Sequence, residues 1–412
     1  MSESRPGGSG PRSEQFLRDP YPVYARLRAD AAVHRFGDLN GMQSWFVAGY
    51  GDVREALSDR RLAKDPRRPG APRRRQLSGR THPLARNMLS TDPPDHTRLR
   101  RLVSRAFTPR RIEERLRPRV QQITDRLLDA IGAGGEVDLI DGLAFPLPVT
   151  VICELLGVPS EDRDQFRAWS DTMITPDVSP GADERRMAAG AAMRGYLSDL
   201  TAARRPGVRA DLPEDEQPDL ISVLIAARDG ADALSEVELI STLVLLLIAG
   251  HETTVNLISV GMLALLQHPD QLRLLRERPE LGAVAVEELL RFTSPVQRAS
   301  FRYASEEIEI GGVTIPSGAM VSLGIASGNR DGSHFAEPDR LDITRADNPH
   351  LAFGHGIHFC LGAPLARQEG QIAFASLLRQ FSGIELAVPA AELRWRPGLL
   401  RGLIELPLRL TV

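Results

Sequence analysis

The chain has 412 residues, of which 42% are hydrophobic and 25% are charged, and its formal net charge is only −3. These values are ordinary for a large globular protein, and a nearly neutral chain with a single lysine among many arginines gives no indication of nucleic-acid binding. The two cysteines, Cys153 and Cys360, are too far apart in the sequence to suggest a disulfide framework, and the first residues lack the pattern of a secretory signal. We therefore expect a cytoplasmic protein.

The N-terminal part combines a polar tail with short elements. Residues 1–14 are rich in Gly, Ser and Pro and are predicted to be a disordered tail, followed by a single domain over residues 15–412. We expect a helix over 22–29, a strand over 44–47 and a helix over 52–57. Residues 65–80 are dense in Pro, Gly and Arg and show no period, which predicts a loop that we interpret as a lid over a pocket.

From residue 95 onward the apolar residues follow a helical period. Helices are predicted over 97–107, 112–131, 148–156, 162–173, 184–204, 220–228, 236–266, 269–276 and 281–292. Short strands are predicted only later, over 307–310, 313–315 and 320–323, with glycine-rich turns between them. The fold class is therefore mainly α with small antiparallel β-sheets. The most apolar stretch, residues 239–249, is well short of the roughly 20 residues that a membrane span requires, so no membrane association is expected.

One cysteine lies in a segment of unusual composition, residues 353–364, which reads FGHGIHFCLGAP. Cys360 lies where a helix is predicted to begin, and Gly354, Gly356 and Gly362 remove side-chain bulk around it. A free thiol titrates at about 8.5, but N–H groups at the start of a helix, the helix dipole and a bound metal all favour its anion. The segment suits a thiolate that binds the iron of a large, flat cofactor.

Two other motifs overlap this segment. Gly354-x-Gly356 resembles the start of a dinucleotide-binding fingerprint, but Phe359 occupies the place of the third glycine. His355-x-x-His358-x-Cys360 has a spacing seen in zinc sites, but no second cysteine lies nearby to complete a closed zinc shell. We therefore expect neither site, and Cys153 is interpreted as a small buried hydrophobic residue.

In order and spacing, these residues match the haem-binding signature Phe-x-x-Gly-x-x-x-Cys-x-Gly, so the chain resembles a cytochrome P-450. The resemblance extends from residue 22 to the C-terminal strands. It implies the cytochrome P-450 fold, a single large helical haem domain, with haem b (iron protoporphyrin IX) bound through Cys360. It further implies a monooxygenase that inserts one oxygen atom of O2 into a C–H bond, by hydroxylation or epoxidation. The wording of residues 247–258 is most similar to that of actinobacterial hydroxylases of macrolides, other polyketides and sterol-like molecules.

The buried helix at 243–248 continues into Ala249-Gly250-His251-Glu252-Thr253-Thr254, where small residues and hydroxyls replace the leucines that packing would favour. The Thr253 hydroxyl can bond the carbonyl of Ala249, four residues earlier, and open the helix there. The resemblance makes this the long helix that crosses the haem face, with Ala249 against the haem. Glu252 and Thr253 are then the acid–alcohol pair that delivers protons for O–O cleavage.

Haem carries two propionates, which need cations of fixed geometry when they are buried. The positions that match the family's propionate ligands are His96, Arg100, Arg302 and His358, and Arg298 is an alternative to Arg302. A separate pair, Glu288-x-x-Arg291, falls on one helix face and matches the family's Glu-x-x-Arg. With Arg340 of Pro338-Asp339-Arg340 it is interpreted as a scaffold for the cysteine loop.

The partners follow from the same resemblance. The substrate pocket is predicted to be lined by Asn87, Met88, Leu89, Leu245, Ala249 and Val296, which suit a bulky lipophilic molecule such as a macrolide, sterol or terpenoid. No flavin or iron–sulfur domain fits in this length, so electrons should come from a ferredoxin and a ferredoxin reductase, with docking near the arginines of 98–111 and Arg367. Two alternatives remain open: a haem-thiolate peroxygenase, and a non-catalytic haem protein that binds or recruits a ligand.

Overall fold

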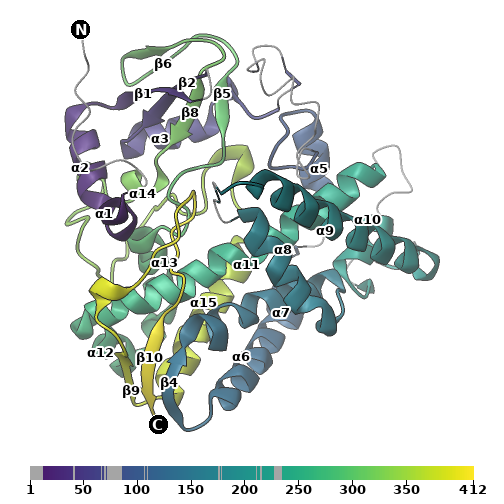
Figure 1. Cartoon of the computed structure of the whole chain (residues 1–412), viewed down its shortest axis with the longest axis vertical. Coiled ribbons are helices and arrows are strands. Elements are labelled where there is room, and N and C mark those ends of the chain that lie inside the picture. Colours follow the sequence, from purple (N-terminus) through teal and green to yellow (C-terminus); the bar gives the residue numbers. More distant parts are fainter. Residues whose placement is uncertain are drawn as a thin grey trace.

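A computed structural model describes residues 13–412, except 40–41, 66, 69–70, 72–85, 106, 109, 175–176, 178, 210, 214–215 and 227–233. Helices form most of the molecule, and the N-terminal strands and helices gather with the 302–323 strands at one end of it (Figure 1). Most of the predicted tail 1–14 and most of the predicted lid 65–80 lie outside the described residues. Ser13 is described, and its hydroxyl caps the first helix by accepting from the N–H of Phe16.

The helices predicted from periodicity are confirmed, with bounds that shift by a few residues. They are α2 (Tyr21–Asp30), α3 (Tyr50–Ser58), α5 (Asp95–Ser104), α6 (Arg117–Ile131), α7 (Pro146–Leu156), α8 (Arg163–Ile174), α9 (Ala182–Arg204), α10 (Leu220–Ala226), α11 (Glu236–Gln267), α12 (Pro269–Glu277) and α13 (Gly282–Thr293). The predicted helix 112–131 begins as a π-helical segment, η1 (Arg111–Leu116), because Pro118 at the start of α6 cannot donate a main-chain hydrogen bond. Short α1 (Glu14–Arg18) and α14 (Ile325–Gly328) were not predicted.

Three sheets complete the fold. The largest has the order β1-β2-β8-β5-β3, from β1 (Val33–Leu39), β2 (Met42–Val47), β8 (Met320–Leu323), β5 (Arg302–Ala304) and β3 (Leu62–Ala63). The second sheet has the order β4 (Gly134–Asp138), β10 (Pro407–Thr411) and β9 (Gly383–Leu386). In the third sheet, β6 (Ile308–Ile310) pairs with β7 (Val313–Ile315). All described pairings are antiparallel except β2 with β8, which is parallel. The prediction of antiparallel sheets was therefore wrong for this pair, which a long connection through the helices permits.

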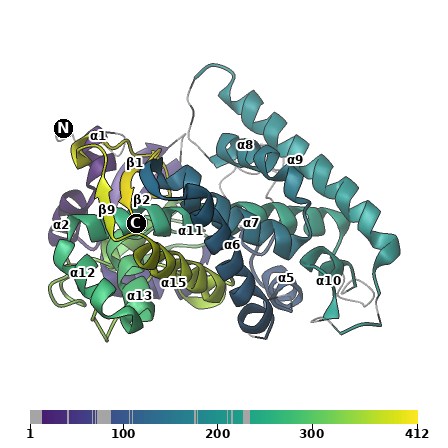
Figure 2. The ribbon, with the colours of Figure 1, turned by 90° about the horizontal axis from the view of Figure 1, so that it is seen from below.

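Helix α11 is the central element of the helical part (Figures 1 and 2). It begins at a capping box in which Ser235 and Glu238 satisfy each other's main-chain N–H groups. It contacts α7, α9, α13 and α15 (Ala363–Gln380), the helix that follows Cys360. Among the described residues, α11 is the single helix with the length and hydropathy of a membrane span, but 78% of its apolar window is buried inside the protein. Such burial is what a core helix of a folded domain requires.

Arg401 joins a C-terminal segment of the chain to α1. This buried side chain donates to the carbonyls of Leu17 and Arg18 at 2.9 and 2.8 Å, and it stacks on Trp395 at 3.9 Å from the ring centroid. The C-terminal segment thus fixes α1 and the start of α2 in place.

Candidate active site

The segment before Cys360 is held against α3 at a position where only glycine fits. Gly356 begins the short helix η7 (Gly356–His358) with a φ of +72°, and a Cβ there would lie 2.8 Å from Ser58 Oγ and 3.1 Å from Ser58 Cα. The Cys360 N–H then donates to the carbonyl of Phe353 at 2.9 Å. Together these contacts fix the loop and place the sulfur directly before α15.

Two opposing effects act on the pKa of the Cys360 thiol. Burial among protein atoms raises the pKa of the Cys360 thiol, whereas the N–H groups of Gly362 and Ala363 and the charges of Arg100 and Arg367 lower it. The net shift is upward, so the helix start alone does not produce a thiolate. A metal cation at the sulfur would do so, because a coordinating thiol loses its proton outright.

The surface around the sulfur is apolar and open. Protein atoms crowd the Cys360 thiol on most sides, yet the residue keeps an accessible face, and its neighbours Ile357 and Phe359 are 38% and 40% exposed. Ala249 is exposed as well, although most of α11 around it is buried. Exposed apolar side chains of this kind suit contact with a flat hydrophobic ring. The donor set is a single soft sulfur, and the described residues contain no group of three or more His, Cys, Asp or Glu that could hold a metal.

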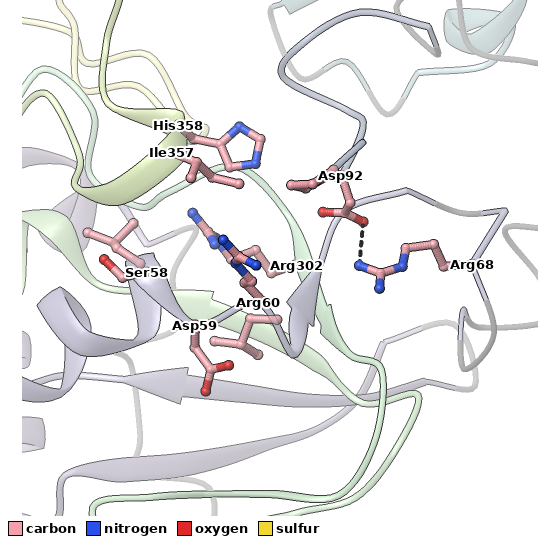
Figure 3. Close-up of a pocket in the computed structure, with 11 residues that line it drawn as sticks. Ser58, Asp59, Arg60, Arg68, Asp92, Arg302, Ile357 and His358 are labelled. Atoms are coloured by element: carbon pink, nitrogen blue, oxygen red, sulfur yellow. Dashed lines mark ion pairs between the residues drawn. The ribbon is translucent and has the colours of Figure 1, made fainter. Parts of the chain in front are cut away.

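A pocket beside the cysteine loop gathers basic groups. Figure 3 shows His358 and Arg302 lining it together with Asp92, which pairs with Arg68 at 3.6 Å. His96 lies edge-to-face against His358, with ring centroids 4.4 Å apart. Lys64 is also buried here and donates to Ser300 Oγ at 2.7 Å. The carboxylates of this pocket are already engaged.

Those carboxylates are Asp92 and Asp59. The Asp92 carboxylate accepts the main-chain N–H groups of Lys64 and Asp65 as well as pairing with Arg68, and Asp59 pairs with Arg61 at 2.7 Å. The remaining basic groups therefore face one another without an equal number of free anions. Two propionates would supply the missing charge.

The protonation of these groups reflects the excess of positive charge. Burial, together with the charges of Arg100 and Lys64, lowers the pKa of His96 to about 4. Burial and the same cationic cluster hold the pKa of His358 well below its usual range, and burial lowers the pKa of Arg302 to about 10. Neither ring nitrogen of His96 has a well-formed hydrogen bond, and Arg302 Nε lacks one too. Unpaired buried donors of this kind indicate a site built for an anionic ligand.

The structure brings three of the four predicted propionate ligands together, and the fourth is adjacent. Arg100 donates from Nη2 to the carbonyl of Phe359 at 2.7 Å, so it lies against the cysteine loop. Arg298, the alternative to Arg302, is placed differently, since its charge acts on Tyr24 of α2. Arg302, which is buried beside His358, has the better position for a propionate.

The side-chain hydrogen bond that was predicted to open α11 is present. Thr253 Oγ1 donates to the carbonyl of Ala249 at 3.0 Å. Glu252 is buried, and burial alone would raise its pKa, but a hydrogen bond and charge from His251, with Arg396 and Arg167 farther out, lower the pKa of Glu252 below its ordinary value. The carboxyl group and the hydroxyl thus belong to consecutive residues, of which Glu252 is buried and Thr253 is half-buried.

The predicted pocket residues have mixed surroundings. Met88 and Leu245 are buried in the main hydrophobic core, Leu89 packs against it, and Val296 is half-buried. Asn87 is fully buried, and its Oδ1 accepts from the N–H groups of Leu89 and Ser90, so its side chain closes a turn. Their assignment to a substrate pocket stays a prediction.

The Glu-x-x-Arg scaffold differs from its prediction in one member. Glu288 and Arg291 are completely buried and paired at 2.7 Å. The third arginine is Arg345, whose Nε lies 3.2 Å from Glu288. Arg340 contributes only its carbonyl to Arg291, while its side chain pairs with Glu337 at the surface. The prediction of Arg340 was therefore wrong, because a motif alone does not reveal which nearby arginine points inward.

Two further residues were missed. Lys64 and Glu369 are both buried. Each has a polar neighbour in the sequence, so the sequence alone suggests an exposed side chain. The signal that could have found Lys64 is that it is the chain's single lysine among many arginines. For Glu369 the sequence gives no comparable signal.

The helical fold, the cysteine loop and the basic pocket together define a haem-thiolate protein. The pattern of the family described as Cytochrome P450 matches residues 165–390, and the chain belongs to the cytochrome P450 family. It is a monooxygenase whose cofactor is haem b.

Several known proteins are similar to it over nearly their whole length. It is 49% identical to Vitamin D(3) 25-hydroxylase of Pseudonocardia autotrophica, covering 96% of this chain and 94% of that protein. It is 46% identical to cytochrome P450 monooxygenase PikC of Streptomyces venezuelae, covering 97% and 93%. The solved structure of the bacillaene polyketide synthase cytochrome P450 PksS of Bacillus subtilis 168 superposes with a TM-score of 0.88 at 42% identity, covering 98% and 100%.

Proposed function

We propose that this monooxygenase hydroxylates or epoxidises a bulky lipophilic molecule of the polyketide, macrolide or sterol-like class, and that it works in the cytoplasm with a ferredoxin and a ferredoxin reductase. The observation that carries the proposal is Cys360, which an ordered glycine loop holds under an apolar surface beside a basic pocket. The names of the relatives support the substrate class, since they include a vitamin D(3) hydroxylase and a cytochrome P450 of polyketide biosynthesis.

The chain's own residues have separate tasks in this proposal. Cys360 would bind the haem iron, and the propionates would lie against His96, Arg302 and His358, with Arg100 at the cysteine loop. When bound, haem supplies the redox chemistry that activates dioxygen. Glu252 would relay protons, and the Thr253 hydroxyl would orient their transfer. The apolar side chains around Ala249 would exclude water and position the substrate.

The first test is spectroscopic. Serine at position 360 removes the thiolate, so we expect Cys360→Ser to lose the Soret maximum that the reduced, carbon-monoxide-treated wild type shows. Cys153→Ala is the matched control: Cys153 is fully buried, and burial raises its thiol pKa to about 12, so it stays neutral and its removal should leave the spectrum unchanged. A Soret band that is unaltered in Cys360→Ser would contradict the assignment. A spin-shift screen over polyketides, sterols and terpenes then identifies ligands, and product analysis tests turnover.

The alternatives give different results in the same preparation. A peroxygenase would turn over faster with peroxide than with ferredoxin and reductase, which the adjacent Glu252 and Thr253 argue against. A haem protein that only binds a ligand would show the spin shift without an oxygen-dependent product.

Fewer arginines are placed to contact a ferredoxin than the predicted docking region, residues 98–111 and Arg367, contains. Arg98 pairs with Glu238, Arg111 is buried and donates to Gln217, and Arg367 pairs with Glu287 at 2.7 Å, so these three serve internal contacts. Arg101 and Arg105, at the end of α5, are exposed.

An acidic ferredoxin docking at this position predicts that reversing both charges slows electron transfer and weakens its salt dependence. Stopped-flow reduction of Arg101→Glu/Arg105→Glu measures this. Arg26→Glu, on exposed α2, is the control and should change neither quantity. Unchanged rates and salt dependence in the double variant would remove this docking site.

A further inference from the structure

A buried histidine lies between the acid of α11 and the neighbouring helix α8. The His251 and Glu252 side chains are 4% and 7% exposed, and Ser170 of α8 is buried as well. His251 Nδ1 lies 2.6 Å from the carbonyl of Leu247, one turn earlier in α11. Its Nε2 faces two groups, Ser170 Oγ at 3.2 Å and Glu252 Oε1 at 3.4 Å.

The partners fix where the protons are. A carbonyl can only accept, so Nδ1 must carry a hydrogen, and in a neutral ring Nε2 is then an acceptor. An ionised carboxylate is also only an acceptor. The contact between Nε2 and Oε1 is therefore attractive only when one further proton lies between them, on the ring or on the carboxyl group. His251 and Glu252 thus form a pair that stores one proton.

Ser170 is followed in α8 by a partly exposed residue. Asp171, the residue after Ser170, pairs with Arg396 at 3.1 Å and lies 4.0 Å from Arg167, and these three side chains are partly exposed. Arg167 also pairs with Asp141 of η2 (Ile140–Ala144).

The charged groups that the structure places around the pair are thus two arginines, Arg167 and Arg396, and two aspartates, Asp141 and Asp171. Phe145 packs edge-to-face on the His251 ring, and the Arg167 guanidinium lies 4.2 Å from the centroid of the Phe145 ring. These opposite charges partly cancel, and the net effect of His251 and the two arginines is to lower the pKa of Glu252.

We propose that Ser170, His251 and Glu252 form a proton wire that refills the carboxyl group beside Thr253 from the α8 surface. This rests on the proposed function. In each step an O–H or N–H bond breaks and another forms: a hydronium ion from solvent gives a proton to the Ser170 hydroxyl and becomes water, that hydroxyl gives its own proton to Nε2, and Nε2 passes one to the Glu252 carboxylate. No electrons move. Oxygen reduction consumes two protons per turnover, and one carboxyl group holds a single proton, so the second must be resupplied.

The histidine is tested by its amide isostere. Glutamine at position 251 can still bond Glu252, but it cannot take up and release a proton at neutral pH. We expect His251→Gln to lower product turnover about ten-fold, to raise the solvent isotope effect, to flatten the pH profile and to divert electrons to hydrogen peroxide. Substrate affinity from the spin shift should stay within about two-fold. Ser170→Ala should act in the same direction.

Two matched control variants distinguish loss of the proton wire from a packing defect. His268 makes the same contact as His251, from Nδ1 to the carbonyl four residues earlier at 2.8 Å, but no carboxylate pairs with it among the described residues. Thr172 of α8 bonds the carbonyl of Ala168 at the surface. His268→Gln and Thr172→Val should therefore leave the isotope effect and the peroxide yield unchanged. If His251→Gln and Ser170→Ala match these controls while the wild type forms product, the wire is refuted and the proposed function stands.

A second measurement does not depend on turnover. In the reduced, carbon-monoxide-treated holoprotein, histidine ¹⁵N spectra report whether Nε2 carries a proton. We expect a shared proton at Nε2 of His251 in the wild type and a bare nitrogen in Glu252→Gln at the same pH. An Nε2 signal that Glu252→Gln leaves unchanged would overturn the proposal. A wild type that binds ligand but yields no product would instead count against the proposed function alone.

Discussion

Glu369 of α15 is a carboxyl group enclosed by protein. Burial raises the pKa of Glu369 to about 8, with a hydrogen bond from Thr254 as the opposing influence, and its Oε1 has no hydrogen-bond partner. The folded protein therefore keeps this group protonated at neutral pH, whereas the unfolded chain ionises it near its ordinary pKa of 4.5.

The pH dependence has a definite sign. Between about pH 4.5 and 8 the folded state binds the proton and the unfolded state does not, so the stability contributed by Glu369 falls as pH rises, by roughly 1.4 kcal/mol per pH unit. Glu369→Gln removes the titration, and we expect its free energy of unfolding relative to the wild type to increase from pH 5 to pH 8. Urea denaturation at both values measures this. Glu385→Gln, on the exposed side of β9, should show no such trend; an equal trend in both would refute the assignment.

Some of the residues in the site could be predicted from the sequence, and others could not. Cys360 and its glycines could be predicted, because the residues that form a thiolate loop are close together in the sequence. Lys64, Arg345 and Glu369 could not, since their roles depend on burial and on partners from distant segments. An isolated charged residue in a sequence has no mark that separates an exposed side chain from an enclosed one.

At the scale of elements, the spacing between α11 and α15 depends on Gly261. A Cβ at this position would lie 2.8 Å from Phe374 Cζ of α15 and 3.5 Å from Leu289 Cδ1 of α13. Because α15 begins next to Cys360, this close approach sets the distance between the cysteine loop and the helix that carries Glu252 and Thr253. A buried aromatic ring gives way less easily than a flexible chain end.

Alanine at Gly261 should therefore destabilise the protein. Overpacking of a close-packed core costs about 1 to 3 kcal/mol, which exceeds the roughly 1 kcal/mol that alanine gains over glycine in a helix. The same substitution at Gly195 of α9 meets no atom within 4 Å, so Gly195→Ala should stabilise by up to about 1 kcal/mol. Urea midpoints of the two variants should move in opposite directions, and a shift of Gly261→Ala to higher urea would contradict this packing argument.

The elements themselves were largely predictable. Long helices such as α6, α9 and α11 follow from a sustained period, and their boundaries shifted by only a few residues. The parallel pairing of β2 with β8 did not follow, because pairing between strands far apart in the chain depends on the packed helices between them.

At the scale of the whole molecule, Arg291 joins the helical part to the segments that lead to the cysteine loop. Besides Glu288, its guanidinium donates to the carbonyls of Asn329, Pro338 and Arg340 at 2.9, 2.7 and 3.1 Å. Removing one partner of a fully buried ion pair leaves an uncompensated charge.

We expect Arg291→Met to lose about 3 to 5 kcal/mol of stability and to be purified with less haem. The carbonyls at 329–340 lose their anchor, and with them the path of the chain toward Cys360. Arg278→Met breaks an exposed pair with Glu280 and should cost less than about 1 kcal/mol. Unfolding midpoints and the haem-to-protein absorbance ratio measure both effects. Full haem occupancy and wild-type stability in Arg291→Met would exclude the anchoring role.

The contact between Arg401 and the carbonyls of Leu17 and Arg18 has a consequence for biosynthesis. A ribosome makes residue 17 long before residue 401, so α1 emerges without the side chain that secures it. The contact between them can form only after residue 401 has left the ribosome, so a late step of folding joins an early part of the nascent chain to a much later one.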